Sequence, residues 1–299
     1  MMIANEYDIN ITNMKRYFLF RSPNLLLVLT FTIALLTFCN KEKTSDGVNQ
    51  LTLFSCKDRP VTRATVDNVW SGGEQVQVSI DNGAAITFSA HPSGTLTPVS
   101  PIYWQNASQS ISARAWYPDS WSFPVDQRAG LQPADFIFAS TVTGIMASNY
   151  TEKPLIFHHW TAKVTVNLTA GTDVSSVNGA TVAFCGYTSG TPDSSDTGNG
   201  VITGSGNGWI SPQNMNGGTY VALLIPRDMT GTQFVRITIG GNDYFYTPTA
   251  GQAVLQQGMS YMYNITVYMT RIDVEVAEGI VWTDGNEYNI TPLLGNNSS

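Results

Sequence analysis

Short runs in which apolar and polar residues alternate recur along the chain after residue 50, and this period of two limits the fold more than any other feature. Successive side chains of a β-strand point to opposite faces, so alternation predicts strands that bury one face. Val164, Val166 and Leu168 share one face of a run whose other face carries Lys163, Thr165 and Asn167, as expected of a half-buried antiparallel strand. The clearest runs are Gln75–Ile80, Lys163–Leu168, Tyr220–Ile225, Phe234–Ile239, Tyr261–Tyr268 and Ile272–Val276.

Turn-forming residues separate these runs. Asp81-Asn82-Gly83 lies between two predicted strands, where an Asn-Gly pair tolerates the positive φ of a tight hairpin turn. The stretch 240–243, with sequence Gly-Gly-Asn-Asp, is expected to form a similar turn between the predicted strand that ends at Ile239 and the one that begins at Tyr244. No long stretch combines helical periodicity with capping residues. The sequence therefore predicts an all-β protein with almost no helix.

Two domains are expected from the length of 299 residues, since a domain usually takes roughly 100–200. The polar segment Asn149–Pro154 ends in proline and is the best candidate linker. We therefore expect one β-sandwich over 64–154 and a second over 155–299. The glycine-rich segment 188–207 is expected to be a long solvated loop. Calcium binding by its aspartates is the alternative, but the terminal bidentate acid of a known calcium loop is missing.

Charge and motifs exclude several functions. Charged residues make up only 12% of the chain and the net charge is −7, so no basic surface is available for nucleic acid. The sequence has no GxSxG, HExxH or glycine-rich phosphate loop, and we expect no catalytic site and no cofactor. His158 and His159 are neighbours on a predicted strand, so they face opposite sides and cannot form a two-histidine metal face. We predict a protein that is neither an enzyme nor a metal binder.

A targeting signal is expected over residues 1–38. Basic residues between Met14 and Arg21 precede the apolar run 25–38, which is the layout of a secretory signal. The run is shorter than the roughly 20 residues that a membrane-spanning helix needs. The layout fits best if translation starts at Met14, because the residues before it add acidic side chains ahead of the basic ones.

Cys39 ends the apolar run and precedes a polar stretch, which resembles the site of lipid attachment in bacterial lipoproteins. Leu36 fits that pattern, but Phe38 does not, since a small residue normally precedes the cysteine. The alternative is an ordinary signal peptide with an incidental cysteine. Cys56 is not the lipid site, because polar residues precede it where export needs an apolar segment. Cys56 and Cys185 belong to no CxxC pair, and they form either a disulfide or two separate thiols.

Four stretches, taken in their order along the chain, resemble the fimbrillin family of Bacteroidales, the lipoprotein-derived pilins. They extend over roughly residues 50 to 285. They are 62–78, with Thr-Arg-Ala-Thr and then Trp-Ser-Gly-Gly-Glu; 113–118, Ala-Arg-Ala-Trp-Tyr-Pro; 135–139 with 155–164, ending His-His-Trp-Thr-Ala-Lys-Val; and 263–267 with Trp-Thr-Asp-Gly at 282–285.

The resemblance implies two sandwich domains of transthyretin-like topology and assembly by exchange of a strand. In that scheme an Arg-specific extracellular protease removes a leader, here 39–63, and a strand of another subunit fills the vacated groove by β-strand addition. Leu51, Leu53 and Phe54 fit the leader strand, and Arg63 fits the cut site before Ala64. The alternative for Arg63 is an ordinary linker arginine.

The C-terminal stretch 286–294 is a candidate donor strand, because Tyr288 and Ile290 project to one side of an extended chain. The expected partners are other pilin subunits, the protease, and the outer membrane through the lipid, so the expected location is fimbriae on the cell surface. A carbohydrate-binding surface lipoprotein is the alternative, since seven Trp and thirteen Tyr are available for stacking. A long exposed aromatic row would favour sugar binding, and a groove under 51–54 would favour the pilin.

Cys39→Ala should abolish incorporation of labelled palmitate, because the acylated cysteine becomes the N-terminus of the mature lipoprotein. Cys56→Ala is the control and should keep full labelling. Labelling of the Cys39→Ala variant at the normal level would place the lipid elsewhere.

Overall fold

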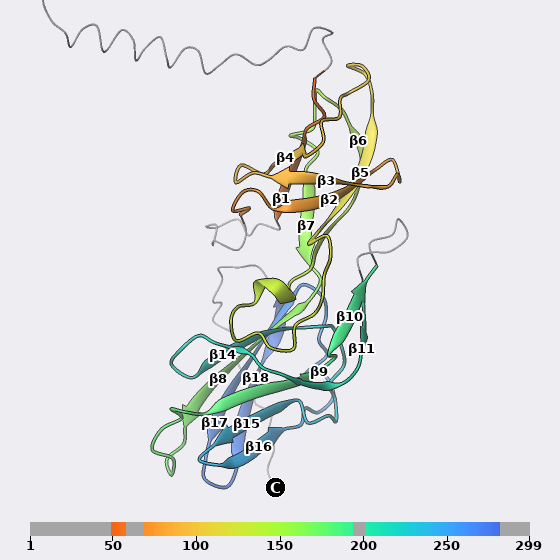
Figure 1. Ribbon diagram of the computed structural model, residues 1–299. Coiled ribbons are helices and arrows are strands. Elements are labelled where there is room, and N and C mark those ends of the chain that lie inside the picture. Colours follow the sequence, from red (N-terminus) through yellow and green to blue (C-terminus); the bar gives the residue numbers. More distant parts are fainter. Residues whose placement is uncertain (1–48, 58–68, 194–200, 282–299) are drawn as a thin grey trace, which may run out of the picture. The chain divides into compact units, whose positions relative to one another are not determined.

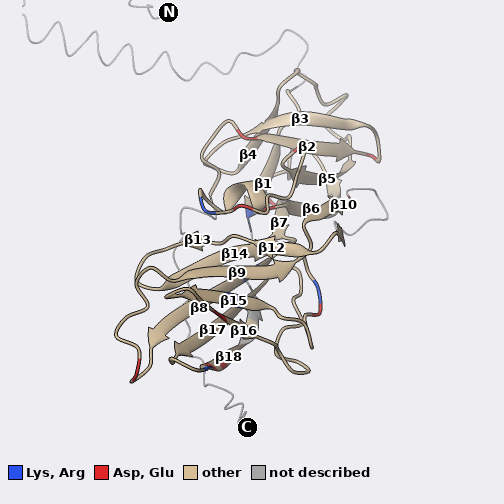
Figure 2. Cartoon of the chain, turned by 60° about the horizontal axis from the view of Figure 1, so that its bottom comes forward, with Lys and Arg blue, Asp and Glu red and all other residues tan. Residues whose placement is uncertain are grey.

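The computed structural model describes residues 49–57, 69–193 and 201–281, which belong to one compact unit, Val48–Ser299 (Figure 1). Within these ranges the regular elements are β-strands, apart from the three-residue 3-10 helix η4 (Gln132–Ala134), which confirms the all-β class. No helix in this part of the chain is long and apolar enough to cross a membrane. Charged residues are sparse along the strands (Figure 2), in keeping with the low charged fraction of the sequence.

Seven strands form a closed barrel in the order β1-β4-β3-β2-β5-β6-β7. This differs from the β-sandwich expected for the first half of the chain. The barrel closes because β1 pairs antiparallel with β4 on one side and parallel with β7 on the other. The strands are β1 (Leu53–Lys57), β2 (Gln75–Ile80), β3 (Ala85–Ala90), β4 (Thr95–Pro98), β5 (Ile111–Tyr117), β6 (Ile137–Ile145) and β7 (Leu155–His159).

The turn between β2 and β3 lies one residue earlier than the sequence indicated. Asp81 and Asn82 adopt positive φ values of 47° and 59°, while Gly83 does not. The amide of Gly83 donates to the carbonyl of Ile80 at 2.8 Å, which makes 81 and 82 the central residues of the turn. Asp and Asn tolerate this conformation because their short polar side chains bond locally.

A sandwich of two sheets follows the barrel in sequence. Its four-stranded sheet has the order β12-β9-β15-β16 and its five-stranded sheet the order β13-β14-β8-β17-β18. The strands are β8 (Ala162–Ala170), β9 (Thr181–Gly186), β12 (Gly208–Ile210), β13 (Gln213–Asn214), β14 (Thr219–Leu224), β15 (Val235–Ile239), β16 (Asn242–Tyr246), β17 (Met259–Val267) and β18 (Ile272–Val281).

Aromatic side chains form the centre of the sandwich core. The ring of Phe234 lies 5.9 Å from Phe184 and 5.6 Å from Tyr263, measured between centroids. The Tyr263 hydroxyl is satisfied because it donates to the carbonyl of Gln252 at 3.0 Å. Burial raises the pKa of Tyr263 far above its usual range and that of Tyr246 to about 12. Both tyrosines therefore remain neutral core residues at physiological pH.

The segment expected to be a long loop contains a hairpin. Strands β10 (Ser189–Pro192) and β11 (Ile202–Ser205) pair antiparallel, with Gly190 opposite Gly204. A side chain at Gly204 would collide with the ring of Tyr187, so close packing explains the glycine in a strand. The prediction of a solvated loop was therefore wrong at both ends of the segment 188–207, where β10 and β11 lie. Residues 194–200 lie outside the described part of the chain.

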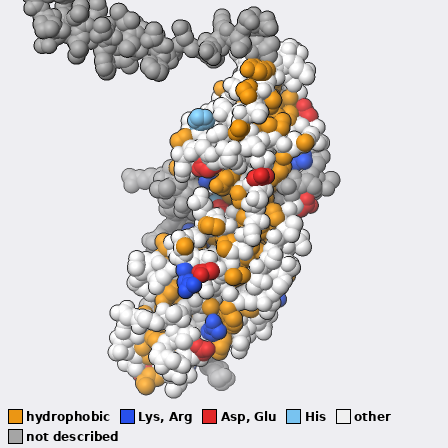
Figure 3. Space-filling view, viewed as in Figure 1, with side chains coloured by type: hydrophobic (Ala, Val, Ile, Leu, Met, Phe, Trp, Pro, Cys, Tyr) orange, Lys and Arg blue, Asp and Glu red, His pale blue; other side chains and the backbone are white. Residues whose placement is uncertain are grey.

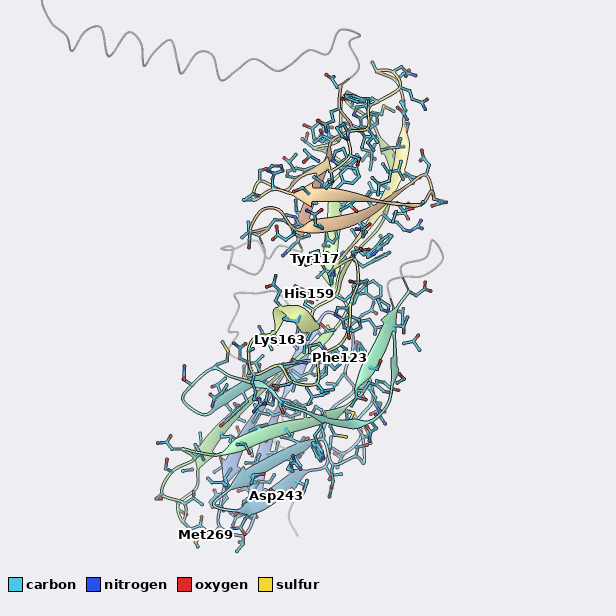
Figure 4. The ribbon with its side chains drawn as sticks, viewed as in Figure 1. Tyr117, Phe123, His159, Lys163, Asp243 and Met269 are labelled. Carbon is cyan, nitrogen blue, oxygen red and sulfur yellow. The ribbon has the colours of Figure 1, made fainter. Side chains whose placement is uncertain are left out.

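The chain passes from the barrel to the sandwich at Trp160 and Thr161, after β7. The expected boundary at residue 154 precedes β7, which pairs with β6 and β1 of the barrel. Tyr117 and His159, labelled in Figure 4, stand at the ends of β5 and β7. The division into separately folding domains stays a prediction.

The connection between β5 and β6 contributes to the sandwich core, where Phe123 and Phe136 are buried. Gln127 ties this connection to β14 and is fully buried. Its Nε2 donates to the Leu223 carbonyl at 2.8 Å, and its Oε1 accepts from the Leu223 amide at 2.8 Å. Two reciprocal bonds to one backbone residue fix the path of a segment that has no regular structure except η4.

Gln127→Ala should lower the free energy of unfolding by about 2 kcal/mol, because it leaves a buried backbone donor and acceptor without their side-chain partners. Denaturant titration measures the change. The exposed Gln233 provides the control, since its replacement by Ala should change stability by less than about 0.5 kcal/mol. Equal losses for the two variants would contradict the structural role of Gln127.

Candidate functional site

From Leu51 to Cys56 the chain alternates between the barrel core and the outside. Leu51 just before the strand, Leu53 and Ser55 are 4%, 1% and 1% exposed, while Phe54 is partly exposed. Two of the three residues predicted for the leader strand, Leu51 and Leu53, thus lie in the barrel core. Phe54 lies on the opposite face and packs beside Gly94.

Backbone hydrogen bonding extends along most of β1 and its approach. The amide of Leu51 donates to the carbonyl of Ile102 at 2.8 Å, and the amide of Trp104 donates to Asn49 at 3.1 Å. Leaving this position empty would expose unpaired backbone groups on both β4 and β7 and uncover the core below. The paired residues are Leu53 with Leu96, Phe54 with Thr95, Ser55 with Leu155, Cys56 with Ile156 and Lys57 with Phe157.

Ser55 is the polar residue on the buried face of β1. Its amide and its hydroxyl both donate to the carbonyl of Gly94, at 2.8 and 2.9 Å. The hydroxyl also accepts from the indole Nε1 of Trp70 at 3.0 Å. Sequence reasoning missed this residue, although a serine in an otherwise apolar alternating frame is a visible signal.

Trp70 covers the end of β1 and is 3% exposed. Its ring meets Phe157 of β7 edge-on at 5.3 Å and Tyr117 of β5 at 5.8 Å. The ammonium of Lys57 lies 4.5 Å from the ring centroid, a cation–π contact that comes from β1 itself. Trp70 follows the predicted cut site at Arg63 in sequence, whereas Ser55 and Lys57 precede it. The indole therefore joins the two sides of that cut.

The electrostatics around Trp70 favour a neutral Tyr117. Burial raises the pKa of the Tyr117 phenol, and the carboxylates of Glu74 and Asp135 raise it further. Asp135 also accepts from Nδ1 of the buried His159 at 3.0 Å. His158 is exposed on the other face of β7, so the two histidines face opposite sides as expected. Within the described ranges, no three acidic, histidine or cysteine side chains are placed to hold a metal.

Several predicted site residues lie outside the described residues. These include the lipid site Cys39 and the processing pair Arg63 and Ala64, together with the donor residues Tyr288 and Ile290. Of the remaining cysteines, Cys56 lies in β1 and Cys185 in β9, and no disulfide joins the two.

On the four-stranded sheet the half-buried ring of Trp209 and the exposed ring of Phe245 form a pair, with centroids 6.2 Å apart. The guanidinium of Arg236 lies 4.7 Å from the Trp209 ring centroid, over the ring that a sugar would use. Arg227 lies in the same way over Tyr187, at 4.6 Å. Hydrophobic side chains occur in separate groups on the visible face rather than in one row (Figure 3). This arrangement gives little support to the sugar-binding alternative.

The position of Gly94 beside β1 depends on its having no side chain. Its φ is +88°, and a Cβ there would collide with the carbonyl oxygen of Ser55 and lie 3.1 Å from the ring of Phe54. Gly73 has a similar φ of +92°, but a Cβ there would meet nothing within 4 Å. Because Gly94 has no side chain, β1 can pack directly against the turn before β4.

The sequence profile of the fimbrillin-like family matches residues 62–280. The chain belongs to this family. The match begins after β1 and contains the other strands of the barrel and nearly all of the sandwich. A search of curated proteins finds no match to this fimbrillin-like chain.

Solved structures share the fold of this fimbrillin-like chain. A candidate cell adhesion protein from Bacteroides uniformis is 18% identical with a TM-score of 0.64, over 81% of this chain and 100% of that one. A second, from Bacteroides ovatus, is 17% identical with a TM-score of 0.57, over 80% and 99%. At such identities the likeness shows the fold alone.

Gly94→Ala should lower the free energy of unfolding by at least about 2 kcal/mol more than Gly73→Ala, because both introduce strain at positive φ but only Gly94→Ala also displaces β1. Hydrogen exchange should become faster at the amides of β1. Equal stability and equal exchange in the two variants would show that the turn before β4 does not seat the strand.

Proposed function

We propose that this fimbrillin-like chain is a structural subunit of cell-surface fimbriae. It is exported as a lipoprotein precursor anchored through Cys39, and it assembles after its first strand has been removed. The observation that carries the proposal is the position of β1, which closes the barrel through backbone bonds to both β4 and β7. A strand held in this way can be replaced by another strand, because main-chain bonding does not depend on sequence.

The segment 58–68 connects β1 to Trp70 and contains Arg63. While this connection is intact, the effective concentration of β1 at its own groove is on the order of millimolar, and a separate strand competes poorly. Cleavage after Arg63 by an Arg-specific protease removes this advantage. The strand can then leave, and the open edges of β4 and β7 accept a strand of another subunit.

The donor in this scheme is an extended segment of a neighbouring subunit. The stretch 286–294 of this chain is a candidate, because Tyr288 and Ile290 would enter the core side of a barrel together. Neighbouring barrels would then be joined by a strand, and the adhesive role follows from display on the cell surface. A transthyretin-like topology, for the barrel strands as for the sandwich strands, belongs to the same proposal.

The similar proteins agree with this assignment at the level of their names. Two of the matching structures are candidate adhesion proteins of Bacteroides, and the family is defined by fimbrillins. An exported structural subunit of this kind needs no active site.

Arg63→Ala should yield a folded monomer that keeps β1 and forms no filaments, because the leader strand stays attached to its groove. Electron microscopy of surface filaments and the mass of the mature chain measure the outcome. Arg59→Ala is the matched control and should assemble normally, since Pro60 makes the bond after Arg59 a poor substrate. Normal filaments from Arg63→Ala would contradict assembly by cleavage at this site.

A further inference from the structure

We propose that Trp70 selects the strand that replaces β1, by requiring a hydroxyl side chain at the position of Ser55. The indole thereby sets the register of the incoming strand. This inference rests on the proposed strand exchange and names the chemistry of the strand that the groove accepts. That strand carries apolar residues at positions i and i+2, as this chain does at Leu51 and Leu53, and serine or threonine at position i+4, as this chain does at Ser55.

The requirement arises from the burial of the indole N–H. Nε1 of tryptophan can only donate, and Trp70 is 3% exposed. Among the described residues its hydrogen-bond acceptor is the hydroxyl of Ser55 at 3.0 Å. A strand with alanine or valine at this position would leave a buried donor without a partner, which costs more than an ordinary hydrogen bond gains.

Ser55 satisfies both of its neighbours because a hydroxyl is at once donor and acceptor. It accepts from Trp70 and donates to the carbonyl of Gly94 at 2.9 Å. Threonine can make the same two bonds, since it carries the same group on Cβ. An apolar residue of similar size can make neither of them.

Hydrophobic alternation alone cannot set the register here. A slip by one residue would turn every apolar side chain of the strand outward, so the burial of these side chains already excludes it. A slip by two would keep the faces correct and move Leu53 to the place of Ser55, beside the indole. Leu51 and Leu53 are equivalent for burial, so the bond between Ser55 and Trp70 is what distinguishes these two registers.

The same requirement bears on which strand fills this groove. If Tyr288 and Ile290 of the tail took the places of Leu51 and Leu53, Pro292 would stand beside Trp70. Proline offers neither a hydroxyl nor an amide hydrogen. The groove is therefore expected to take the strand of a different kind of subunit, while this tail enters a groove of another kind.

The test uses the full chain with a sequence-specific protease site placed within 58–68, so that β1 can be cut without relying on Arg63. Fluorescent peptides of residues 49–57 are added to the cut protein, and their incorporation is followed by polarisation. The native peptide and the Ser55→Thr peptide should bind the cut protein with similar affinity, and the Ser55→Ala peptide should bind roughly tenfold more weakly. A peptide with Leu53 and Ser55 exchanged has the same composition and alternation, and it should also bind roughly tenfold more weakly.

The same peptides are then added to the cut Trp70→Phe chain, where no indole N–H needs a partner. The preference for Ser55 over its alanine variant should fall to about twofold or less, as expected when one partner of a coupled pair is removed. If Trp70→Phe does not fold, the peptide series on the native chain decides alone. Equal binding of the native and alanine peptides to the Trp70 chain, or an unchanged preference in the phenylalanine chain, would overturn the selection by Trp70. If not even the native peptide enters, the proposed strand exchange fails, and the inference fails with it.

Discussion

The barrel depends on one short strand that is hydrogen-bonded on both sides. β1 pairs with β4 and β7, which are far apart in sequence, and its Leu53 is buried in the core that they enclose. A closed sheet has no edges, so each strand protects its neighbours from unwanted pairing. Because β1 is the first described strand, the same element that closes the barrel is also the one that a single cut in 58–68 could release.

Strength and selectivity come from different parts of the β1 position. Backbone bonds to β4 and β7 would be made by any extended chain and therefore hold many sequences equally well. Side chains must supply the selection, and the buried hydrogen bond between Trp70 and Ser55 is a polar contact able to do so. Trp70 follows the connecting segment, so its indole stays with the groove when β1 leaves.

The wall of the groove is anchored in the sandwich. β7 continues through Trp160 and Thr161 into β8, which lies between β14 and β17 in the five-stranded sheet. The connection between β5 and β6 is tied to β14 through Gln127. Phe138 of β6 also packs edge-on against Trp160 at 5.6 Å. These links give β7 a fixed support that does not depend on β1, as a groove that exchanges strands needs.

Local patterns in the sequence determined the all-β class, the strands and the apolar face of the leader, because alternation at Leu51 and Leu53 or at Val164 and Val166 is a property of neighbouring residues. The hairpin β10–β11 escaped prediction because its glycines are explained by distant rings such as Tyr187. Barrel closure and the role of Ser55 were decided only by the tertiary structure. Both depend on partners far away in sequence, β7 for the strand and Trp70 for the hydroxyl, and no local pattern encodes such a pairing.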